Sequence, residues 1–137
     1  MNESSPHPPS KLPYLFLALT MVQAIHSVEE IIGRLYEHFP VVSGYIHNKI
    51  SLVPVLRMSG ITFAIGNLVI VMVLSLVTWF LFRGIRGTVM VARVIGALEI
   101  LNGAAHIGAA IYTGGYFTGS ISGAALIILG AMVTRAK

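Results

Sequence analysis

Long runs of hydrophobic residues dominate the chain, and short polar or glycine-rich segments separate them. A helix of roughly 20 apolar residues is long enough to cross the hydrocarbon core of a bilayer. The pattern predicts four such helices, at about residues 12–32, 61–82, 88–111 and 116–133. We therefore expect an all-α fold: an integral membrane four-helix bundle, with residues 12–134 as its transmembrane helical domain.

Two segments break the hydrophobic pattern. Residues 1–11 are polar and contain three prolines, which is typical of a disordered tail. Residues 33–60 are only moderately apolar, and we expect an interfacial or re-entrant segment there, between the first and second helices. An alternative for residues 1–24 is a cleaved signal peptide that ends at Val22-Gln23-Ala24. The later hydrophobic segments would still anchor the protein in a membrane.

Composition supports this class and excludes others. Only 10% of the residues are charged, against about 25% in an average soluble domain. The chain has no cysteine, which rules out disulfides, thiolate catalysis and cysteine-bound metal. The net charge of +4 is not gathered on the face of a soluble fold, so we expect no nucleic acid partner.

The basic residues predict an orientation. With four spans, both termini and the turn near residue 85 lie on one side of the membrane. That side carries six basic residues against three on the other. Because cytoplasmic segments are enriched in Lys and Arg, we expect a multi-pass protein of the cell membrane with both termini in the cytoplasm. The six are Lys11, Arg83, Arg86, Arg93, Arg135 and Lys137, and the three are Arg34, Lys49 and Arg57.

The third and fourth helices are rich in small residues, including the close-packing spacing Gly119-xxx-Gly123. Such faces favour helix packing inside one chain. The alternative is a homo-oligomer through the small-residue faces of residues 88–111 and 116–133.

Two polar stripes interrupt the apolar helices. In the first helix His26 precedes Glu29 by three residues and Glu30 by four, so each lies near the same face. Glu29 and Glu30 are about 100° apart around the helix, so they cannot point equally at one site. We expect one of them at the centre, with the other behind it or at a second centre.

The second stripe lies in the third helix, where Glu99, Asn102 and His106 are related by spacings of three, four and seven. Counted at about 1.5 Å per residue, both stripes fall in the outer half of the bilayer. Gln23 and Asn67 lie at a similar depth. The sequence therefore predicts one site built from separate helices.

Energetics narrows what such a site can be. A carboxylate near the centre of a membrane helix is unfavourable by about 2.5–3.5 kcal/mol, so it must be protonated, hydrogen-bonded or bound to a cation. We expect a divalent metal (Fe, Zn or Mn), as one or two ions, and no organic cofactor. The predicted ligands are His26, Glu29, Glu30, Glu99 and His106. The predicted supporting residues are Gln23, Asn67 and Asn102, and the candidate catalytic residues are Glu29, Glu30 and Glu99.

The run His26-x-x-Glu29-Glu30 late in a first hydrophobic segment resembles the signature of the HXXEE-motif membrane proteins, which are small bacterial and archaeal proteins. The stripe Glu99-x-x-Asn102-x-x-x-His106 is similar to the second polar motif of that family. The resemblance extends from about residue 12 to residue 133. It implies the protein class and leaves the reaction open.

Four functions fit these residues. The first is a metal-dependent membrane enzyme that acts on a lipid, an isoprenoid or another apolar substrate. The second is a metal-free enzyme that uses glutamate and histidine as acid and base. The third is a subunit of a proton- or ion-coupled carrier. The last is a structural polar network in an accessory membrane protein.

Overall fold

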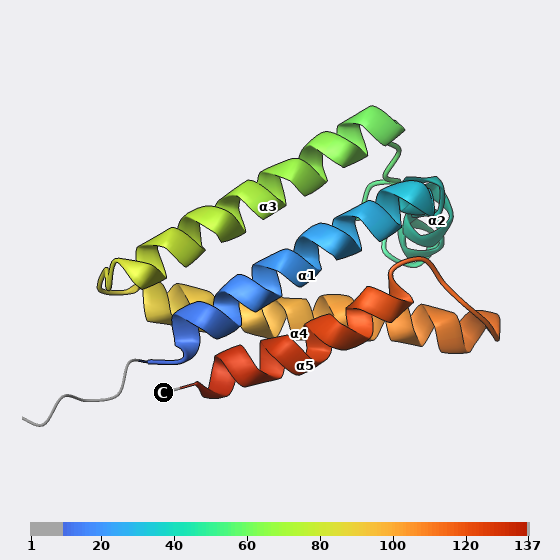
Figure 1. Ribbon diagram of the computed structural model, residues 1–137. Coiled ribbons are helices and arrows are strands. Elements are labelled where there is room, and N and C mark those ends of the chain that lie inside the picture. Colours follow the sequence, from blue (N-terminus) through green and yellow to red (C-terminus); the bar gives the residue numbers. More distant parts are fainter. Residues whose placement is uncertain (1–9, 137) are drawn as a thin grey trace, which may run out of the picture.

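The computed structural model describes residues 10–136, and within them the chain is all-helical, with no strand. Five α-helices and one short 3₁₀ helix follow one another along the chain (Figure 1). They are α1 (Leu12–Ile32), η1 (Leu35–Glu37), α2 (Phe39–Lys49), α3 (Gly60–Phe82), α4 (Thr88–Thr113) and α5 (Ser120–Arg135). Nine residues of the expected tail, 1–9, lie outside the described residues.

Three helices, α1, α3 and α4, are long and apolar enough to cross a membrane. Their bounds agree with the predicted spans to within two residues. The predicted fourth span corresponds to α5, which has 16 residues. At 1.5 Å per residue α5 is about 24 Å long, shorter than a hydrocarbon core of about 30 Å. The structure thus supports a membrane protein with three candidate spans, and the fourth stays a prediction.

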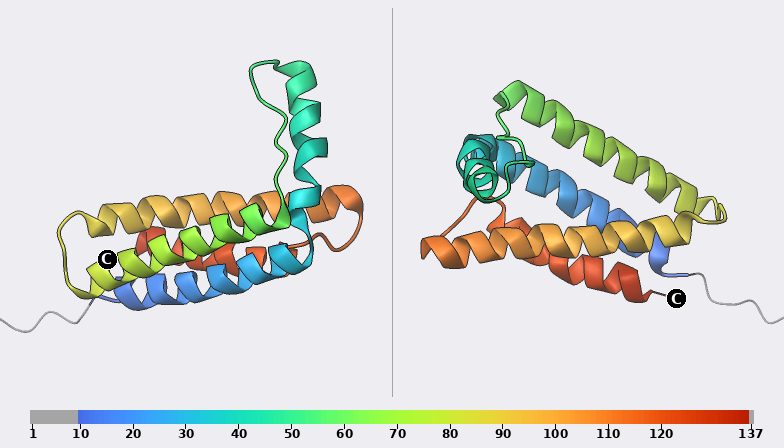
Figure 2. Two further views of the ribbon diagram at one scale, coloured as in Figure 1. Left: turned by 90° about the horizontal axis from the view of Figure 1, so that it is seen from above. Right: turned by 180° about the vertical axis from the view of Figure 1, so that it is seen from behind.

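The four long helices lie alongside one another with alternating directions, so α1 and α4 run the same way (Figures 1 and 2). Helix α1 packs against α3 on one side and α5 on the other, and α4 packs mainly against α5. The start of α1 and the end of α5 lie at the same end of the molecule (Figure 1). The side of the membrane on which that end lies stays a prediction.

Small residues bring α4 and α5 together. A Cβ at Gly96 would lie 3.0 Å from the carbonyl oxygen of Gly130, and one at Gly103 would collide with the carbonyl of Gly123. These glycines are therefore used for helix packing inside one chain. A homo-oligomer through the same faces is untested and stays a prediction.

The apolar core fills one half of the molecule, toward the turn that joins α3 to α4. Its fully buried members include Phe16 and Leu19 of α1 and Leu126 of α5. A buried hydrogen bond of 3.0 Å between the hydroxyls of Thr20 and Thr78 joins α1 to α3. Polar side chains therefore collect in the other half, near α2.

The connector between α1 and α3 contains the helix α2, which starts at one end of the long helices and projects away from them (Figure 2). The chain returns from α2 in an irregular segment, which is fixed by a hydrogen bond of 2.8 Å from the amide of Leu56 to the hydroxyl of Ser43. Val41 and Tyr45 on α2 are 73% and 66% exposed. An exposed apolar face suits an interfacial helix, and whether α2 is interfacial or re-entrant stays a prediction.

Candidate functional site

Glu30 lies between two histidines from different helices. Its Oε1 is 3.2 Å from Nε2 of His26, one turn earlier on α1, and 3.0 Å from Nε2 of His106 on α4. Glu30, His26 and His106 are 7%, 0% and 6% exposed, respectively. One ligand atom from each lies within 4.8 Å of the others, so this group could hold a metal ion. We call it the His-Glu-His cluster.

The second ring nitrogen of His106 is held by the backbone. Nδ1 of His106 lies 2.6 Å from the carbonyl oxygen of Thr118. A carbonyl can only accept a hydrogen bond, so Nδ1 carries the proton and donates it. In the neutral ring, Nε2 of His106 therefore presents its lone pair to Glu30.

His26 is held in the same way by a serine. Its Nδ1 is 2.7 Å from the hydroxyl of Ser122, and that hydroxyl donates its own proton to the carboxylate of Glu29. The oxygen of Ser122 must therefore accept from Nδ1 of His26. Nε2 of His26 is left with a lone pair, which accepts from the amide of Asn102 at 3.3 Å.

Two lone pairs and a carboxylate oxygen thus converge on one point. Neutral imidazoles in these tautomers repel the oxygen of Glu30, because all three atoms are acceptors. A proton on a ring or on the carboxyl group, or a cation at the centre, removes that conflict. Metal-binding histidines commonly have the other ring nitrogen fixed by a carbonyl or a similar group, as both rings have here.

Glu29 points away from the cluster, to the start of α5. Its two oxygens accept hydrogen bonds from the hydroxyl of Tyr116 (2.7 Å), the amide of Gly119 (3.1 Å) and the amide of Ser122 (3.2 Å), as well as from the hydroxyl of Ser122. Four donors and the positive end of a helix favour a carboxylate. The bond to Glu29 also raises the pKa of the Tyr116 phenol.

The segment 116–122 therefore holds the cluster in place, and we call this segment the clamp. Through Thr118 and Ser122 it fixes both rings, and the hydroxyl of Thr118 donates to the backbone carbonyl of Glu29 at 3.0 Å. Gly119 is the residue just before α5 and has φ of 83°, and a Cβ there would lie 2.5 Å from Nδ1 of His106 and 2.9 Å from Cε1 of His26. A side chain would displace both rings.

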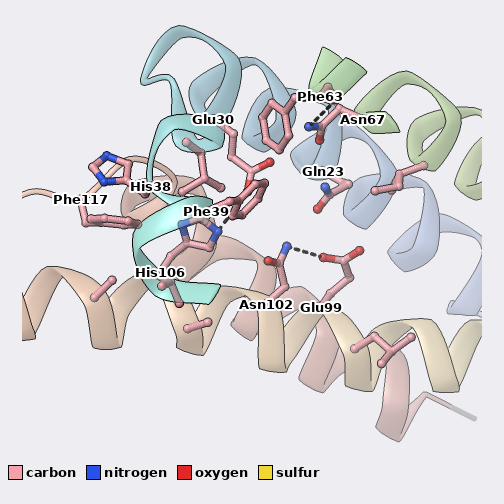
Figure 3. Close-up of a pocket in the computed structure, with 16 residues that line it drawn as sticks. Gln23, Glu30, His38, Phe39, Phe63, Asn67, Glu99, Asn102, His106 and Phe117 are labelled. Carbon is pink, nitrogen blue, oxygen red and sulfur yellow. Dashed lines mark hydrogen bonds and ion pairs between the residues drawn. The ribbon is translucent and has the colours of Figure 1, made fainter. Parts of the chain in front are cut away.

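Glu99 and Asn102 extend the cluster along α4. The amide nitrogen of Asn102 donates to Oε2 of Glu99 at 3.3 Å as well as to His26. Figure 3 shows this pair beside Gln23, with Glu30 and His106 further along the same cavity. Glu99 is buried but lies outside the three-residue group that could hold an ion.

The cavity beside the cluster has a volume of about 600 Å³ and is mainly apolar. It lies between α1, α2, α3 and α4, and Phe117 closes one end (Figure 3). A volume of this size suits a small organic ligand. The lining residues are Gln23, Glu30, Leu35, His38, Phe39, Val42, Phe63, Asn67, Ile70, Leu98, Glu99, Asn102, Ala105, His106, Ala109 and Phe117.

Most predicted site residues thus occupy one region. The structure brings His26, Glu30 and His106 together, and places Glu99, Asn102, Gln23 and Asn67 around the same cavity or cluster. It directs Glu29 to α5 instead. The metal and catalytic roles assigned to all of these residues stay predictions.

Sequence reasoning missed the clamp residues. Tyr116, Thr118, Gly119 and Ser122 belong to a run that reads as the start of a fourth span, and α5 begins only at Ser120. The sequence signal for this segment is the group of hydroxyl residues on either side of Gly119. Such a group is unusual inside an apolar helix and indicates a polar segment before the helix starts. His38, an exposed residue just before α2, borders the cavity as well, with its ring centroid 5.4 Å from that of Phe117.

Replacing Glu29 by glutamine should destabilise the fold and leave the residues that line the cavity unchanged. The amide group would place a donor against the N–H groups of Gly119 and Ser122, so we expect a loss of about 1–3 kcal/mol in the free energy of unfolding. Denaturant titration in detergent measures it. Glu37→Gln is the matched control, because within residues 10–136 Glu37 pairs only with Arg34, at 3.4 Å on the surface, and its loss should change stability by under about 0.5 kcal/mol. Equal stability of the two variants would contradict the clamp.

Comparison with known proteins gives one result. The family model described as "Protein of unknown function with HXXEE motif" matches residues 17–134. No match is found among curated proteins or solved structures. The match runs from Leu17 of α1 through α2, α3 and α4 to the last turn of α5, and so includes the His-Glu-His cluster and its clamp. With its motif at His26, Glu29 and Glu30, the chain belongs to the HXXEE family.

Proposed function

We propose that this protein is a metal-dependent membrane enzyme that acts on a lipid-like or other apolar substrate. One observation carries the proposal: two imidazoles, each fixed through Nδ1, direct Nε2 at the same oxygen of Glu30. A divalent cation would bind all three acceptors, and Nε2 of His26 would then direct its lone pair at the ion in place of the Asn102 amide. Without a cation, a proton would have to be added to a ring or to Glu30 to supply a donor.

The ligand types indicate which metals fit. Two histidines and one carboxylate occur in zinc hydrolases and in non-haem iron enzymes, and they leave positions free for water or substrate. We propose one ion, Fe, Zn or Mn, at the His-Glu-His cluster. A second ion would need Glu99, which is bound to Asn102 at one edge of the site.

The surroundings suit chemistry on an apolar molecule. A bound ion would polarise a substrate oxygen or a water molecule. Glu99 borders the cavity, and Asn102 holds one of its oxygens at 3.3 Å, so Glu99 is oriented to accept a proton from a substrate or a water. The aromatic and aliphatic walls would exclude bulk water and take up the apolar part of the substrate.

The membrane placement is part of the proposal. Helices α1, α3 and α4 would cross the bilayer, and α5 would lie as a shorter fourth span in the groove of α1 and α4. The α2 end would face outward from the cell membrane, with both termini in the cytoplasm, as the basic residues predict. The substrate would then be reached from the outer half of the bilayer.

Metal analysis of the purified protein tests the proposal. We expect full-length protein, purified in detergent without chelator, to carry about one Fe, Zn or Mn per chain. Chelator treatment should remove the metal, and adding it back should restore about one equivalent. Protein that is metal-free and fails to take up any of the three ions would overturn the proposal.

A metal-free acid–base enzyme is the second candidate, and one observation favours it. The contacts of 3.0 and 3.2 Å around Glu30 are short enough for direct hydrogen bonds from protonated rings. In that case the carboxylate and the imidazoles would exchange protons with a substrate in the cavity. Histidine nitrogen shifts in NMR spectra distinguish the two, because in the metal-free enzyme at least one Nε2 either carries a proton or accepts one from Glu30, whereas in the metal enzyme both Nε2 atoms bind the ion.

A further inference from the structure

Gln23 carries a buried polar atom without a partner. Its side-chain oxygen has no hydrogen-bond partner in the described part of the chain, although the residue is only 3% exposed. Its amide nitrogen makes one long contact of 3.5 Å with the hydroxyl of Ser27. A buried acceptor left unpaired is unfavourable by about 1–3 kcal/mol, so it is expected to have a partner in the working protein.

Gln23 borders the cavity, beside other acceptors (Figure 3). Asn67 uses its amide nitrogen on the carbonyl of Phe63 at 3.3 Å, which leaves its oxygen without a protein partner among the described residues. Glu99 receives one hydrogen bond, from Asn102, and its other oxygen has none within the same part of the chain. These three side chains, from α1, α3 and α4, form what we call the acceptor subsite.

The charges around the cavity restrict what can bind there. Among the described residues, those that line it include two glutamates and two histidines but no lysine or arginine. Away from the His-Glu-His cluster, a phosphate or carboxylate head group would find no lysine or arginine among the described lining residues beside Gln23, and it would be repelled by Glu99. A hydroxyl or an amine supplies the donors that the acceptor subsite lacks.

The remaining walls fit an apolar chain. Phe63 and Ile70 of α3 and Leu98 of α4 line the cavity beyond the polar groups. Ile70 and Leu98 are also 46% and 58% exposed, so they lie at its rim on the surface that the bilayer would cover. A lipid could therefore place its head at the acceptor subsite and leave its tail between α3 and α4.

We propose that Gln23, Asn67 and Glu99 recognise the head group of an amphiphile that donates hydrogen bonds, namely a lipid alcohol or amine. This inference rests on the proposed function for the role of that molecule as substrate. Binding itself requires only the cavity, so it can be tested in protein from which metal has been removed.

Native mass spectrometry of chelator-treated, full-length protein tests the inference. The protein is offered an equimolar mixture of dodecanol, dodecylamine and dodecanoate, which share one tail and differ in the head group. We expect the alcohol or the amine to be retained roughly tenfold more than the carboxylate, which has no donor at neutral pH. Equal retention of all three amphiphiles would overturn the inference.

Variants of Gln23 make the test specific. Gln23→Leu should remove the preference and should leave the thermal stability of the empty protein unchanged or higher, because it deletes an unpaired buried acceptor. Gln23→Met, which is closer in shape, should act alike. Ile70→Leu is the control that keeps the preference, since it alters only the apolar wall. A preference that survives in both Gln23 variants would contradict the inference, whatever the metal content of the untreated protein.

Discussion

Glu30→Gln is expected to lose the metal while the protein keeps its fold. The substitution removes the only carboxylate of the His-Glu-His cluster and its negative charge, so we expect metal affinity to fall by at least about 100-fold. The fold should persist because the new amide can donate a hydrogen bond to Nε2 of His26 or His106. In the wild type without metal, the carboxylate oxygen faces lone pairs on both of these nitrogens. Elemental analysis and thermal unfolding in detergent measure the two effects.

Two controls separate this result from general damage. Glu37→Gln alters an exposed glutamate and should retain the wild-type metal content. Glu29→Gln alters the neighbouring residue of the motif, whose side chain is bound at the start of α5. It should lower the free energy of unfolding and leave most of the metal bound. If Glu30→Gln protein carried as much metal as the wild type, Glu30 would not be a ligand. If Glu29→Gln lost the metal and Glu30→Gln kept it, the two glutamates would have exchanged the roles that their contacts indicate.

Spacing along the chain was sufficient to find the polar stripes. His26 and Glu30 are four apart, and Glu99, Asn102 and His106 follow helical spacing, so the helices that carry them could be assigned faces without coordinates. Because both helices run in the same direction, counting residues also predicted that the stripes lie at one level. The structure places them in contact, with Glu30 reaching His106 at 3.0 Å.

The choice between Glu29 and Glu30 could not be made from spacing. Both residues are within one turn of His26, and which of them faces α4 depends on how α1 is rotated. That rotation is fixed by distant contacts, among them the bond from the Thr118 hydroxyl to the carbonyl of Glu29. The start of α5 depends on the same contacts, because Glu29 binds the amide of Gly119, the residue just before Ser120.

Hydropathy also did not predict the path of the chain between α1 and α3. His38 and Phe39 border the cavity because the chain changes direction at the left-handed turn of Arg34 (φ 54°), after which α2 projects from the end of the long helices (Figure 2). Such a turn at a non-glycine residue has no hydrophobic signature, so residue patterns alone do not reveal it.

Gly119→Ala is expected to destabilise the protein and to disrupt the cluster together. Alanine at φ of 83° is strained by about 1–2 kcal/mol, and its Cβ would lie 2.5 Å from Nδ1 of His106 and 2.6 Å from its Cε1. Crowding of this kind adds about 1–3 kcal/mol. We therefore expect the free energy of unfolding to fall by roughly 2–5 kcal/mol and metal affinity to fall by about 10–100-fold, because both rings are displaced.

Gly114→Ala separates the two causes of that effect. Gly114 ends α4 with φ of 71°, and a Cβ there would meet nothing within 4 Å. Alanine at this position therefore carries the backbone strain without the collision, and it should lower stability by only about 1–2 kcal/mol and leave metal binding unchanged. Chemical unfolding and metal titration of both variants give the comparison. If both lost the same stability and kept the metal, the rings would not depend on the space that Gly119 provides, and the clamp would have no part in holding an ion.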